Sequence, residues 1–384
     1  MIDFEQLRRW PDVEAPELVA HDATDRLLLD TAREALVAHP EHVTIIGDRY
    51  GALTLGAAEL VGPHELRVHQ DALSGELALA ANAAALGSDA AWRSLPLDAS
   101  LVEGARVVLL QLPRGLDALD EITELVAAHA HPEVQLVAGG RVKHMTPAMN
   151  DVLRRHFGTV SAGLARQKSR LLTASGPRSD AGATASSAAS ASSAGTTSTW
   201  PRSERHGDLV VVAHGAAFAG SSIDVGTRAL LEALAVGAPE ASHVVDLGCG
   251  TGVLAASWAL AHPEAHVIAT DQSAAAVASA RATADASGVG DRVESRRDDA
   301  GASLPAGSAG LVLLNPPFHV GATVHAGLAH KLFAAAARLL EPGGELWCVW
   351  NSHLGYRSAL ERTVGPTRQV SRGPKFTVTV STRR

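Results

Sequence analysis

Cysteines, aromatic residues and long apolar runs are all scarce in this sequence. Only 2 cysteines occur among 384 residues, which excludes a disulfide framework and a cysteine-based zinc site and fits a reducing compartment. No 18 consecutive residues are apolar, so we predict no membrane-spanning segment and no membrane partner. The first residues carry acidic side chains and lack the apolar core of a signal peptide, and we therefore expect a cytoplasmic protein.

The sequence also lacks an excess of positive charge. Its formal net charge is −8 at pH 7, which argues against a protein that coats nucleic acid non-specifically but allows a local basic surface. The 18 histidines show no metal-ligand spacing, so no metal is predicted. Hydrophobic residues make up 46% and charged residues 19% of the chain, which is typical of a globular protein and not of a disordered one.

A low-complexity segment divides the chain. Ala, Ser, Thr and Gly make up 24 of the 27 residues from 173 to 199, which leaves the segment almost nothing to bury. This composition favours a flexible linker, and a partly helical strut is the alternative. We predict a first domain over 1–172, a linker over 173–205 and a second domain over 206–384. We expect the protein to be a monomer.

The second half of the chain alternates between short apolar runs and helical stretches. This order indicates a parallel sheet with helices on both faces. A long helix is predicted across 325–340, and the alternating segment 375–381 is predicted to be an antiparallel edge strand. The other strands are predicted at 243–248, 266–271, 292–297, 311–315 and 345–350.

The first half repeats the same order of segments at an offset close to 200 residues. Identical or similar residues align along three pairs of segments, namely 43–53 with 244–254, 67–71 with 267–271, and 107–115 with 311–319. We interpret this as an internal duplication of one α/β unit, because three segments match in the same order. Coincidence among Ala- and Leu-rich strands is the alternative.

A glycine-rich loop, DLGCGTG at 246–252, follows an apolar strand and precedes a helix, where α/β sheets bind nucleotides. Asp246 can accept hydrogen bonds from an ammonium group, Asp271 from two ribose hydroxyls, and Asp299 from an adenine amino group. An amino acid, a ribose and an adenine together describe S-adenosylmethionine. A tight turn beside surface acids is the alternative. The predicted cofactor-binding residues are Asp246, Gly248, Cys249, Gly250, Gly252, Asp271, Asp299 and Asn315.

The fourth predicted strand of this half ends in Asn-Pro-Pro-Phe. Because proline has no backbone N–H, the Asn315 side-chain carbonyl and the Pro316 backbone carbonyl can accept both hydrogens of a planar amino group. This grip directs the nitrogen lone pair at the methyl of a sulfonium, and Phe318 can stack on a base. A proline-bounded strand end is the alternative. The predicted catalytic residues are Asn315, Pro316, Pro317 and Phe318.

These motifs resemble those of class I methyltransferases that modify exocyclic amines. The run NPPFHVG, the segment EPGGELWCVWNSHLGY and the terminal KFTV are similar to the rRNA guanine-N2 methyltransferases of the RsmC/RlmG type, and NSHLGY is closer to the large-subunit type. FAGSSIDVGTRALL at 218–231 also resembles the family, with Asp224, Gly226 and Thr227 at its matching positions. The resemblance implies an α/β fold class with two tandem Rossmann-like class I methyltransferase domains, the N-terminal one degenerate, joined by the Ala/Ser-rich linker.

The resemblance also implies an activity, which is S-adenosylmethionine-dependent methylation of a guanine N2 amine in ribosomal RNA, with 23S favoured over 16S. Because paired bases hide their amines, the guanine is expected in a single strand or flipped out of its stack. In the first half, Arg49 replaces the middle glycine, Ile45 lies opposite Asp246, and QLPR at 111–114 replaces the Asn-Pro-Pro-Phe motif. We predict that this domain binds no S-adenosylmethionine and serves RNA recognition or folding.

Two tracts are rich in basic residues although the whole chain is acidic. Seven Lys or Arg occur over 141–170 against one acid, and seven occur in the last 38 residues, also against one acid. Such tracts favour a phosphate-contacting surface, and solvated helix faces are the alternative. The predicted RNA-binding residues are Arg141, Lys143, Arg166, Lys168, Arg170 and Lys375.

Other functions remain open at this stage. Adenine-N6 and protein-glutamine methyltransferases also use Asn-Pro-Pro-aromatic loops, although they more usually have Tyr where this chain has Phe318. A non-catalytic RNA-binding or ribosome-assembly protein that keeps the fold is the rival from another class. The intact Asn315 and Asp246 argue against this rival, because an unused site should have lost them.

Overall fold

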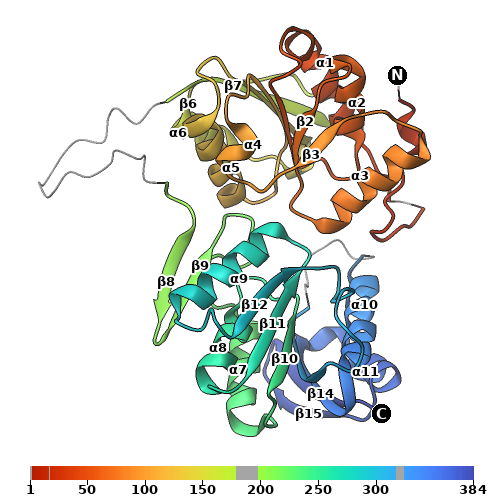
Figure 1. Ribbon diagram of the computed structural model, residues 1–384, viewed down its shortest axis with the longest axis vertical. Coiled ribbons are helices and arrows are strands. Elements are labelled where there is room, and N and C mark those ends of the chain that lie inside the picture. The colour runs from red at the N-terminus through yellow and green to blue at the C-terminus, as the bar shows by residue number, and fades with distance from the viewer. Residues whose placement is uncertain (1, 17, 179–197, 317–323) are drawn as a thin grey trace, which may run out of the picture. The chain divides into compact units, whose positions relative to one another are not determined.

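The chain forms two compact α/β units, Met1–Trp200 and Pro201–Arg384, in the computed structural model (Figure 1). The structure describes residues 2–16, 18–178, 198–316 and 324–384. Each unit contains a seven-stranded sheet, and the second unit has an additional two-stranded sheet.

The first unit has a sheet of strand order β3-β2-β1-β4-β5-β7-β6. Its strands are β1 (Val43–Ile46), β2 (Leu66–His69), β3 (Trp92–Ser94), β4 (Val107–Gln111), β5 (Gln135–Arg141), β6 (Phe157–Ala162) and β7 (Ser169–Pro177). Its helices are α1 (Ala23–Ala38), α2 (Ala52–Val61), α3 (Leu73–Ala85), α4 (Ala99–Val102), α5 (Leu116–His129) and α6 (Ala148–His156).

The second unit has a sheet of strand order β12-β11-β10-β13-β14-β16-β15, and β8 pairs with β9. Its strands are β8 (Arg202–His206), β9 (Leu209–Ala213), β10 (His243–Leu247), β11 (His266–Asp271), β12 (Val293–Arg297), β13 (Ala309–Leu314), β14 (Leu340–Asn351), β15 (Thr367–Arg372) and β16 (Phe376–Thr382). Its helices are α7 (Val225–Gly237), α8 (Val253–Ala261), α9 (Ala274–Ala286), α10 (Val324–Leu339) and α11 (Arg357–Thr363).

The two seven-stranded sheets have the same topology, which confirms the predicted duplication of an α/β unit. In each sheet five parallel strands are followed by an antiparallel pair, β7 and β6 in the first unit and β16 and β15 in the second. The segment predicted to be an edge strand is antiparallel, but it is not at the edge. β16 lies between β14 and β15, because the mostly polar strand β15, which the sequence pattern did not reveal, pairs with its outer side.

Alternating residues of the strands build a core on each face of the sheet. In β13, Leu311 and Leu313 pack with α7, α8 and α9, whereas Val312 and Leu314 pack on the other face with α10 and α11. This alternation follows from the two-residue repeat of a strand. Helices therefore cover both faces, as the order of elements predicted, and the first unit repeats the arrangement (Figure 1).

The ends of the predicted linker at 173–205 are strands and not linker. Residues 173–177 belong to β7, which pairs with both β5 and β6, and residues 202–205 belong to β8. Short Ala, Ser, Thr and Gly side chains give a strand little to bury, but here Ala174 is buried between its neighbours. The middle of the predicted linker, at 179–197, lies outside the described residues.

Candidate active site

The loop between β10 and α8 carries three glycines that its geometry requires. Gly248, Gly250 and Gly252 have φ values of +78°, +52° and +76°, which lie in the left-handed region that other residues rarely adopt. A side chain on Gly248 or Gly250 would meet no atom within 4 Å, whereas a Cβ on Gly252 would lie 2.8 Å from the Cα of Ala280. The first two glycines thus leave open space above the loop, and the third allows α8 to pack closely on α9.

Asp246 lies at the end of β10 and is completely buried. Its Oδ2 accepts a hydrogen bond of 3.0 Å from the Ala255 backbone N–H, and its Oδ1 has no partner among the described residues. Burial raises the pKa of this carboxyl to about 7. A buried carboxyl oxygen without a partner is costly and suits a site that a cationic group completes.

Asp271 links the end of β11 to the glycine loop. Its two carboxylate oxygens accept hydrogen bonds from the backbone N–H groups of Gly250, at 3.1 Å, and Ser273, at 3.0 Å. These two bonds fix the carboxylate of Asp271 between the glycine loop and the start of α9. The predicted ribose-binding residue is therefore held beside the open glycines, and its role toward ribose stays a prediction.

Two further predicted cofactor residues, Asp299 and Cys249, differ in their surroundings. Both carboxylate oxygens of Asp299, which follows β12, accept from the Lys331 ammonium of α10, at 2.7 and 2.6 Å. An adenine amine would therefore meet an ion-paired carboxylate at Asp299. Cys249 is buried within the loop, and burial together with nearby carboxylates raises the pKa of its thiol, so this side chain fills space and stays protonated.

Asn315 follows β13 and is held in one orientation by α7. Its side-chain N–H₂ donates hydrogen bonds of 3.0 Å to Asp224 Oδ2 and of 3.0 Å to Thr227 Oγ1. Asp224 is the N-cap of α7 and also accepts from the backbone N–H groups of Gly226 and Thr227. The Asn315 Oδ1 is buried and has no partner among the described residues. The amide therefore presents its carbonyl oxygen as a free acceptor.

The rest of the Asn-Pro-Pro-Phe motif is only partly described. Pro316 is buried, whereas Pro317 and Phe318 lie outside the described residues. A Cβ on Gly226 would lie 3.3 Å from the ring of Phe376 and 3.4 Å from Asn315 Oδ1, so a larger residue at 226 would crowd both side chains. Phe376, at the start of β16, thus lies near the free carbonyl oxygen.

Comparison with known proteins gives the family. Residues 208–380 match the model of the methyltransferase small domain, and residues 3–178 match that of the RLMG N-terminal domain. The ribosomal RNA large subunit methyltransferase G of Pseudomonas paraeruginosa is 37% identical over 380 residues, covering 97% of this chain and 96% of the relative. That of Streptomyces coelicolor is 34% identical over 381 residues, with 97% and 96% covered. The chain belongs to the ribosomal RNA large subunit methyltransferase G family.

A solved structure supports the same fold. The T. thermophilus 16S rRNA N2 G1207 methyltransferase (RsmC), in complex with AdoMet and guanosine, aligns with a TM-score of 0.68 at 20% identity, over 95% of this chain and 92% of that chain. The two Rossmann-like methyltransferase domains and the predicted family are therefore confirmed. S-adenosylmethionine is the cofactor of this methyltransferase fold, and the open glycines and the unpartnered Asp246 oxygen fit it.

The first unit of this family member has a different loop at the corresponding place. Gly47 and Gly51 keep positive φ values, but the Asp48 carboxylate between them accepts from the backbone N–H groups of Gly51, at 3.1 Å, and Thr54, at 2.8 Å. The Asp48 side chain thus accepts the hydrogen bonds of backbone N–H groups at the start of α2. Arg49 projects from the loop where the second unit has Gly250. That this unit binds no S-adenosylmethionine stays a prediction.

The structure brings together most of the predicted RNA-binding residues. Arg141, at the end of β5, is paired in register with Ser169 of β7, and the Val142 N–H donates to the Lys168 carbonyl. The basic residues around 141–143 and 166–170 therefore share one end of the β5–β7 pair. Lys375 belongs to the second unit, next to Phe376, so it lies at the Asn315 side of that unit.

Sequence reasoning did not find the contact of Asp224 and Thr227 with Asn315. The resemblance had placed both residues at family positions without a role, and 91 residues separate Asp224 from Asn315 in the chain. The pairing of α7 with the end of β13 follows only from the packed sheet.

Among the residues that the structure describes, no cluster of three metal-ligating side chains occurs, and no helix is long and apolar enough to cross a bilayer.

Proposed function

We propose that this protein transfers a methyl group from S-adenosylmethionine to the exocyclic N2 amine of a guanine in ribosomal RNA, with 23S rRNA favoured over 16S rRNA. The carbonyl oxygen of Asn315, buried and unpartnered, is the observation that carries the proposal. The names of the relatives support ribosomal RNA, and the guanosine in the T. thermophilus complex supports the base.

The proposed chemistry needs an acceptor for the amine hydrogens more than it needs a strong base. The Asn315 and Pro316 carbonyl oxygens would each accept one N–H of the guanine amine and so turn its lone pair toward the methyl group. The bound cofactor supplies that methyl on a positively charged sulfur. After transfer the nitrogen carries an extra proton, which leaves to solvent. Orientation and electrostatics supply the rate enhancement in such a site.

The cofactor would be held by the glycine loop and its three acids. The open space above Gly248 and Gly250 allows close approach of the backbone, and Asp271 would accept from the ribose hydroxyls. The buried Asp246 carboxyl, whose pKa burial raises to about 7, would ionise when the cofactor ammonium arrives beside it. Asp299 would accept from the adenine amine while ion-paired with Lys331.

Methyl transfer with nucleoside analysis tests the reaction. Labelled methyl from S-adenosylmethionine is offered to rRNA, and to isolated subunits, from a strain that lacks this gene, and the product is digested to nucleosides. Label in N2-methylguanosine is expected with the wild type, and Asn315→Ala should lower kcat by about 100-fold or more. Gln369→Ala, which removes an exposed amide from β15 of the same unit, is the matched control and should keep full activity.

Each other result points to a different function. Label in N6-methyladenosine would support adenine methylation, and label in protein would support glutamine methylation. No transfer to any RNA despite cofactor binding would favour a non-catalytic RNA-binding role. Mapping of the labelled fragment separates 23S from 16S rRNA. A ribosomal substrate also leads us to expect the protein in the cytoplasm, acting as a monomer on an unpaired or flipped guanine.

A further inference from the structure

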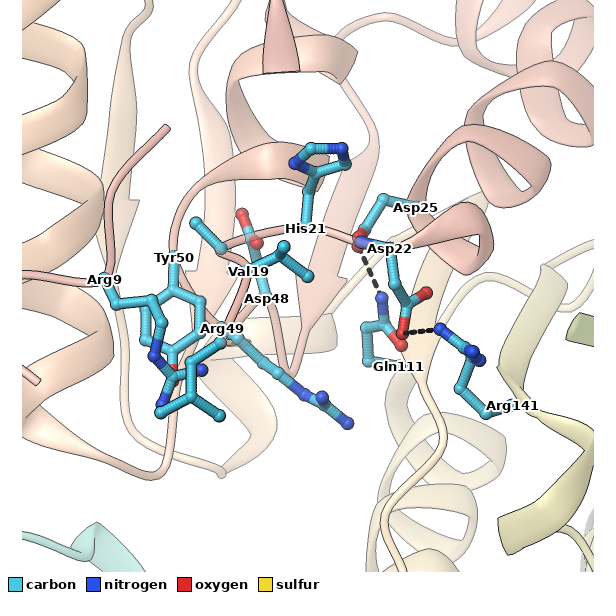
Figure 2. Close-up of a pocket in the computed structure, with 12 residues that line it drawn as sticks. Arg9, Val19, His21, Asp22, Asp25, Asp48, Arg49, Tyr50, Gln111 and Arg141 are labelled. Atoms are coloured by element: carbon cyan, nitrogen blue, oxygen red, sulfur yellow. Dashed lines mark hydrogen bonds and ion pairs between the residues drawn. The ribbon is translucent and has the colours of Figure 1, made fainter. Parts of the chain in front are cut away.

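The first unit contains a cavity of about 180 Å³ at the carboxyl ends of its strands (Figure 2). Its walls come from the start of α1, the loop after β1, the ends of β4 and β5, and the segments around Arg9 and Leu18–His21. The cavity is smaller than the roughly 300 Å³ at which pockets for drug-sized ligands begin, so it suits a small group better than a whole S-adenosylmethionine.

The part of the first unit that corresponds to the cofactor loop is filled by its own side chains. The Asp48 carboxylate occupies the N–H groups at the start of α2, and the Gln70 side-chain amide donates to the Asp48 backbone carbonyl. A Cβ on Gly75 would lie 2.7 Å from the Arg49 carbonyl oxygen, so the loop also packs tightly against α3. The cavity therefore lies on the other side of the loop.

That other side corresponds to the place of Asn315 in the second unit. Gln111 is the last residue of β4, and Asn315 directly follows β13, so the two residues occupy matching places. The side-chain N–H₂ of Gln111 donates a hydrogen bond of 2.5 Å to Oδ1 of Asp25 in the first turn of α1. Asn315 makes the same kind of bond to Asp224 at the start of α7. Both units thus use a carboxylate at the start of the first helix to turn an amide oxygen away from it. The first unit thus has the same kind of amide–carboxylate contact at the place where the second unit is proposed to hold the target base.

The cavity offers hydrogen-bond donors and acceptors side by side. Arg49 is exposed and makes no hydrogen bond or ion pair with the described residues, and Figure 2 shows it extending toward the side where Gln111 and Arg141 lie. Arg141 forms an ion pair of 3.7 Å with Asp22, and its Nε is buried without a partner. The acceptors are the Gln111 carbonyl oxygen and the Asp22 carboxylate, since Gln111 uses its nitrogen on Asp25.

The chemistry of the lining favours one kind of group. A phosphate has no donors for Asp22 and Gln111, and these oxygens would repel it. Guanine presents two acceptors, O6 and N7, which a guanidinium contacts with two parallel bonds. It also presents N1–H and N2–H₂ donors, which need carboxylate or carbonyl oxygens. The two sets of groups match those of the cavity.

Further cations lie near the two arginines that line the cavity. His144, in the short turn after β5, is exposed, and its pKa is lowered first by desolvation and then by the charges of Arg114, Lys143, Arg49 and Arg141. Such a group of cations can neutralise the phosphates on either side of one nucleotide.

We propose that this cavity, lined by Asp22, Arg49, Gln111 and Arg141, binds a second, unmodified guanine of the RNA substrate and thereby positions the RNA. The inference rests on the proposed function in taking RNA as the substrate. It assigns the first unit a base-binding site that the duplicated target-base half of the fold has left behind. The second site recognises a base and catalyses nothing, because the cofactor half beside it is filled.

Crosslinking of the full-length protein locates the base. Ribosomal RNA transcribed with 6-thioguanosine is irradiated with the protein and S-adenosylmethionine, and the crosslinked peptides are sequenced by mass spectrometry. The expected result is a crosslinked peptide from residues 18–25, 49–50 or 109–114, in addition to peptides of the second unit. RNA with 4-thiouridine should not give the peptides of the first unit. Crosslinks confined to the second unit, or equal with both probes, would overturn the proposal.

Kinetics of cavity variants give an independent test. Arg49→Gln and Arg141→Gln should each raise the KM for RNA by about tenfold, which corresponds to one lost bidentate contact, with kcat at saturating RNA and cofactor affinity unchanged. Arg33→Gln, an exposed site on α1 outside the cavity, removes the same charge and is the control. If Arg33→Gln raised the KM for RNA as much as Arg49→Gln does, the effect of Arg49 would be a general effect of positive charge and not a contact in the cavity. That result would overturn the proposal.

The two proposals fail separately. If the wild type methylates RNA but the first unit gives no 6-thioguanosine crosslink, the cavity proposal is wrong and the catalytic one stands. If no RNA is methylated yet the crosslink in the first unit forms and depends on Arg49, the catalytic proposal is wrong and the cavity proposal stands for an RNA-binding protein.

Discussion

The variant Asp224→Asn tests whether the start of α7 orients the Asn315 amide for the proposed methyl transfer. In the wild type, one oxygen of Asp224 accepts from the Gly226 N–H at 2.7 Å, and the other accepts from Thr227 and from the Asn315 N–H₂ at 3.0 Å. An asparagine at 224 has one carbonyl oxygen and one N–H₂ group. If the oxygen of the new asparagine keeps capping the Gly226 N–H, its N–H₂ group faces the N–H₂ group of Asn315. The Asn315 amide then loses its preference for presenting its oxygen to the substrate.

The size of the effect follows from the bond that is lost. A hydrogen bond to a charged group contributes about 1.5–3 kcal/mol, and about 1.4 kcal/mol corresponds to a tenfold change in rate. We expect kcat to fall by about 10- to 100-fold. Cofactor affinity should stay within about twofold of the wild type, because Asp224 has no hydrogen bond with the glycine loop. Asparagine caps helices about as well as aspartate, so Tm should change little.

The assay is methyl transfer to rRNA with kcat and KM determined separately, together with cofactor titration and a thermal melt. Asp291→Asn, an exposed aspartate of the same unit, is the charge-matched control. The decisive step is the double variant with Asn315→Ala. If Asp224 acts through Asn315, the double variant is no slower than Asn315→Ala alone, because coupled residues are not additive. An additional 10-fold loss in the double variant, or an unchanged kcat in the single one, would refute the reasoning.

Two further predictions concern the glycine loop and Asp246. Gly252→Ala should lower the free energy of unfolding by about 1–3 kcal/mol, because φ at this position is +76° and the new Cβ would lie 2.8 Å from Ala280. Gly250→Ala should lower it by about 1–2 kcal/mol but should weaken cofactor binding more than Gly252→Ala does. Chemical denaturation and cofactor titration measure the two effects separately, and equal cofactor affinities of the two variants would contradict the proposed role of the loop. Burial raises the pKa of Asp246 from its ordinary 3.8 to about 7, so between about pH 4 and pH 7 the folded state holds a proton that the unfolded state has lost. The free energy of unfolding should therefore fall as pH rises through this window, less so in Asp246→Asn, while cofactor affinity should rise as the carboxylate ionises. A pH-independent affinity in the wild type would count against the ammonium contact.

The sequence was sufficient to predict the parts of the fold that local patterns encode. The glycine loop with positive φ, the acid at the end of β11 and the asparagine after β13 are all local signals, since each combines a strand end with a residue type that its geometry requires. The duplication was also visible, because aligned strands keep their apolar residues. The position of β16 was not, since the polar sequence of β15 gives no sign that it will cover the outer side of β16.

Contacts between distant segments could not be predicted in the same way. Asp224 reaches Asn315 because α7 packs on β14 and β16, and β14 pairs with β13, whose end Asn315 follows. The ion pair of Asp299 with Lys331 depends in the same way on how α10 packs on the sheet. No pattern in either segment requires the other. The composition that predicted a linker from residue 173 was misleading for a related reason, since β5 and β6 provide the backbone partners for a strand with small side chains.

The two units share an amide–carboxylate contact and differ in the glycine loop. Both retain an amide at the end of the fourth strand, bonded to a carboxylate of the first helix, as Gln111–Asp25 and Asn315–Asp224. Only the second unit retains the open glycines, and in the first Asp48 satisfies the helix N-terminus that a ligand would otherwise face. If the first unit binds no cofactor, as predicted, it needs no open glycines, whereas the proposed base-binding cavity still needs the Gln111 amide. A unit that served folding alone would have no reason to keep the amide–carboxylate pair beside a cavity with an unpartnered arginine.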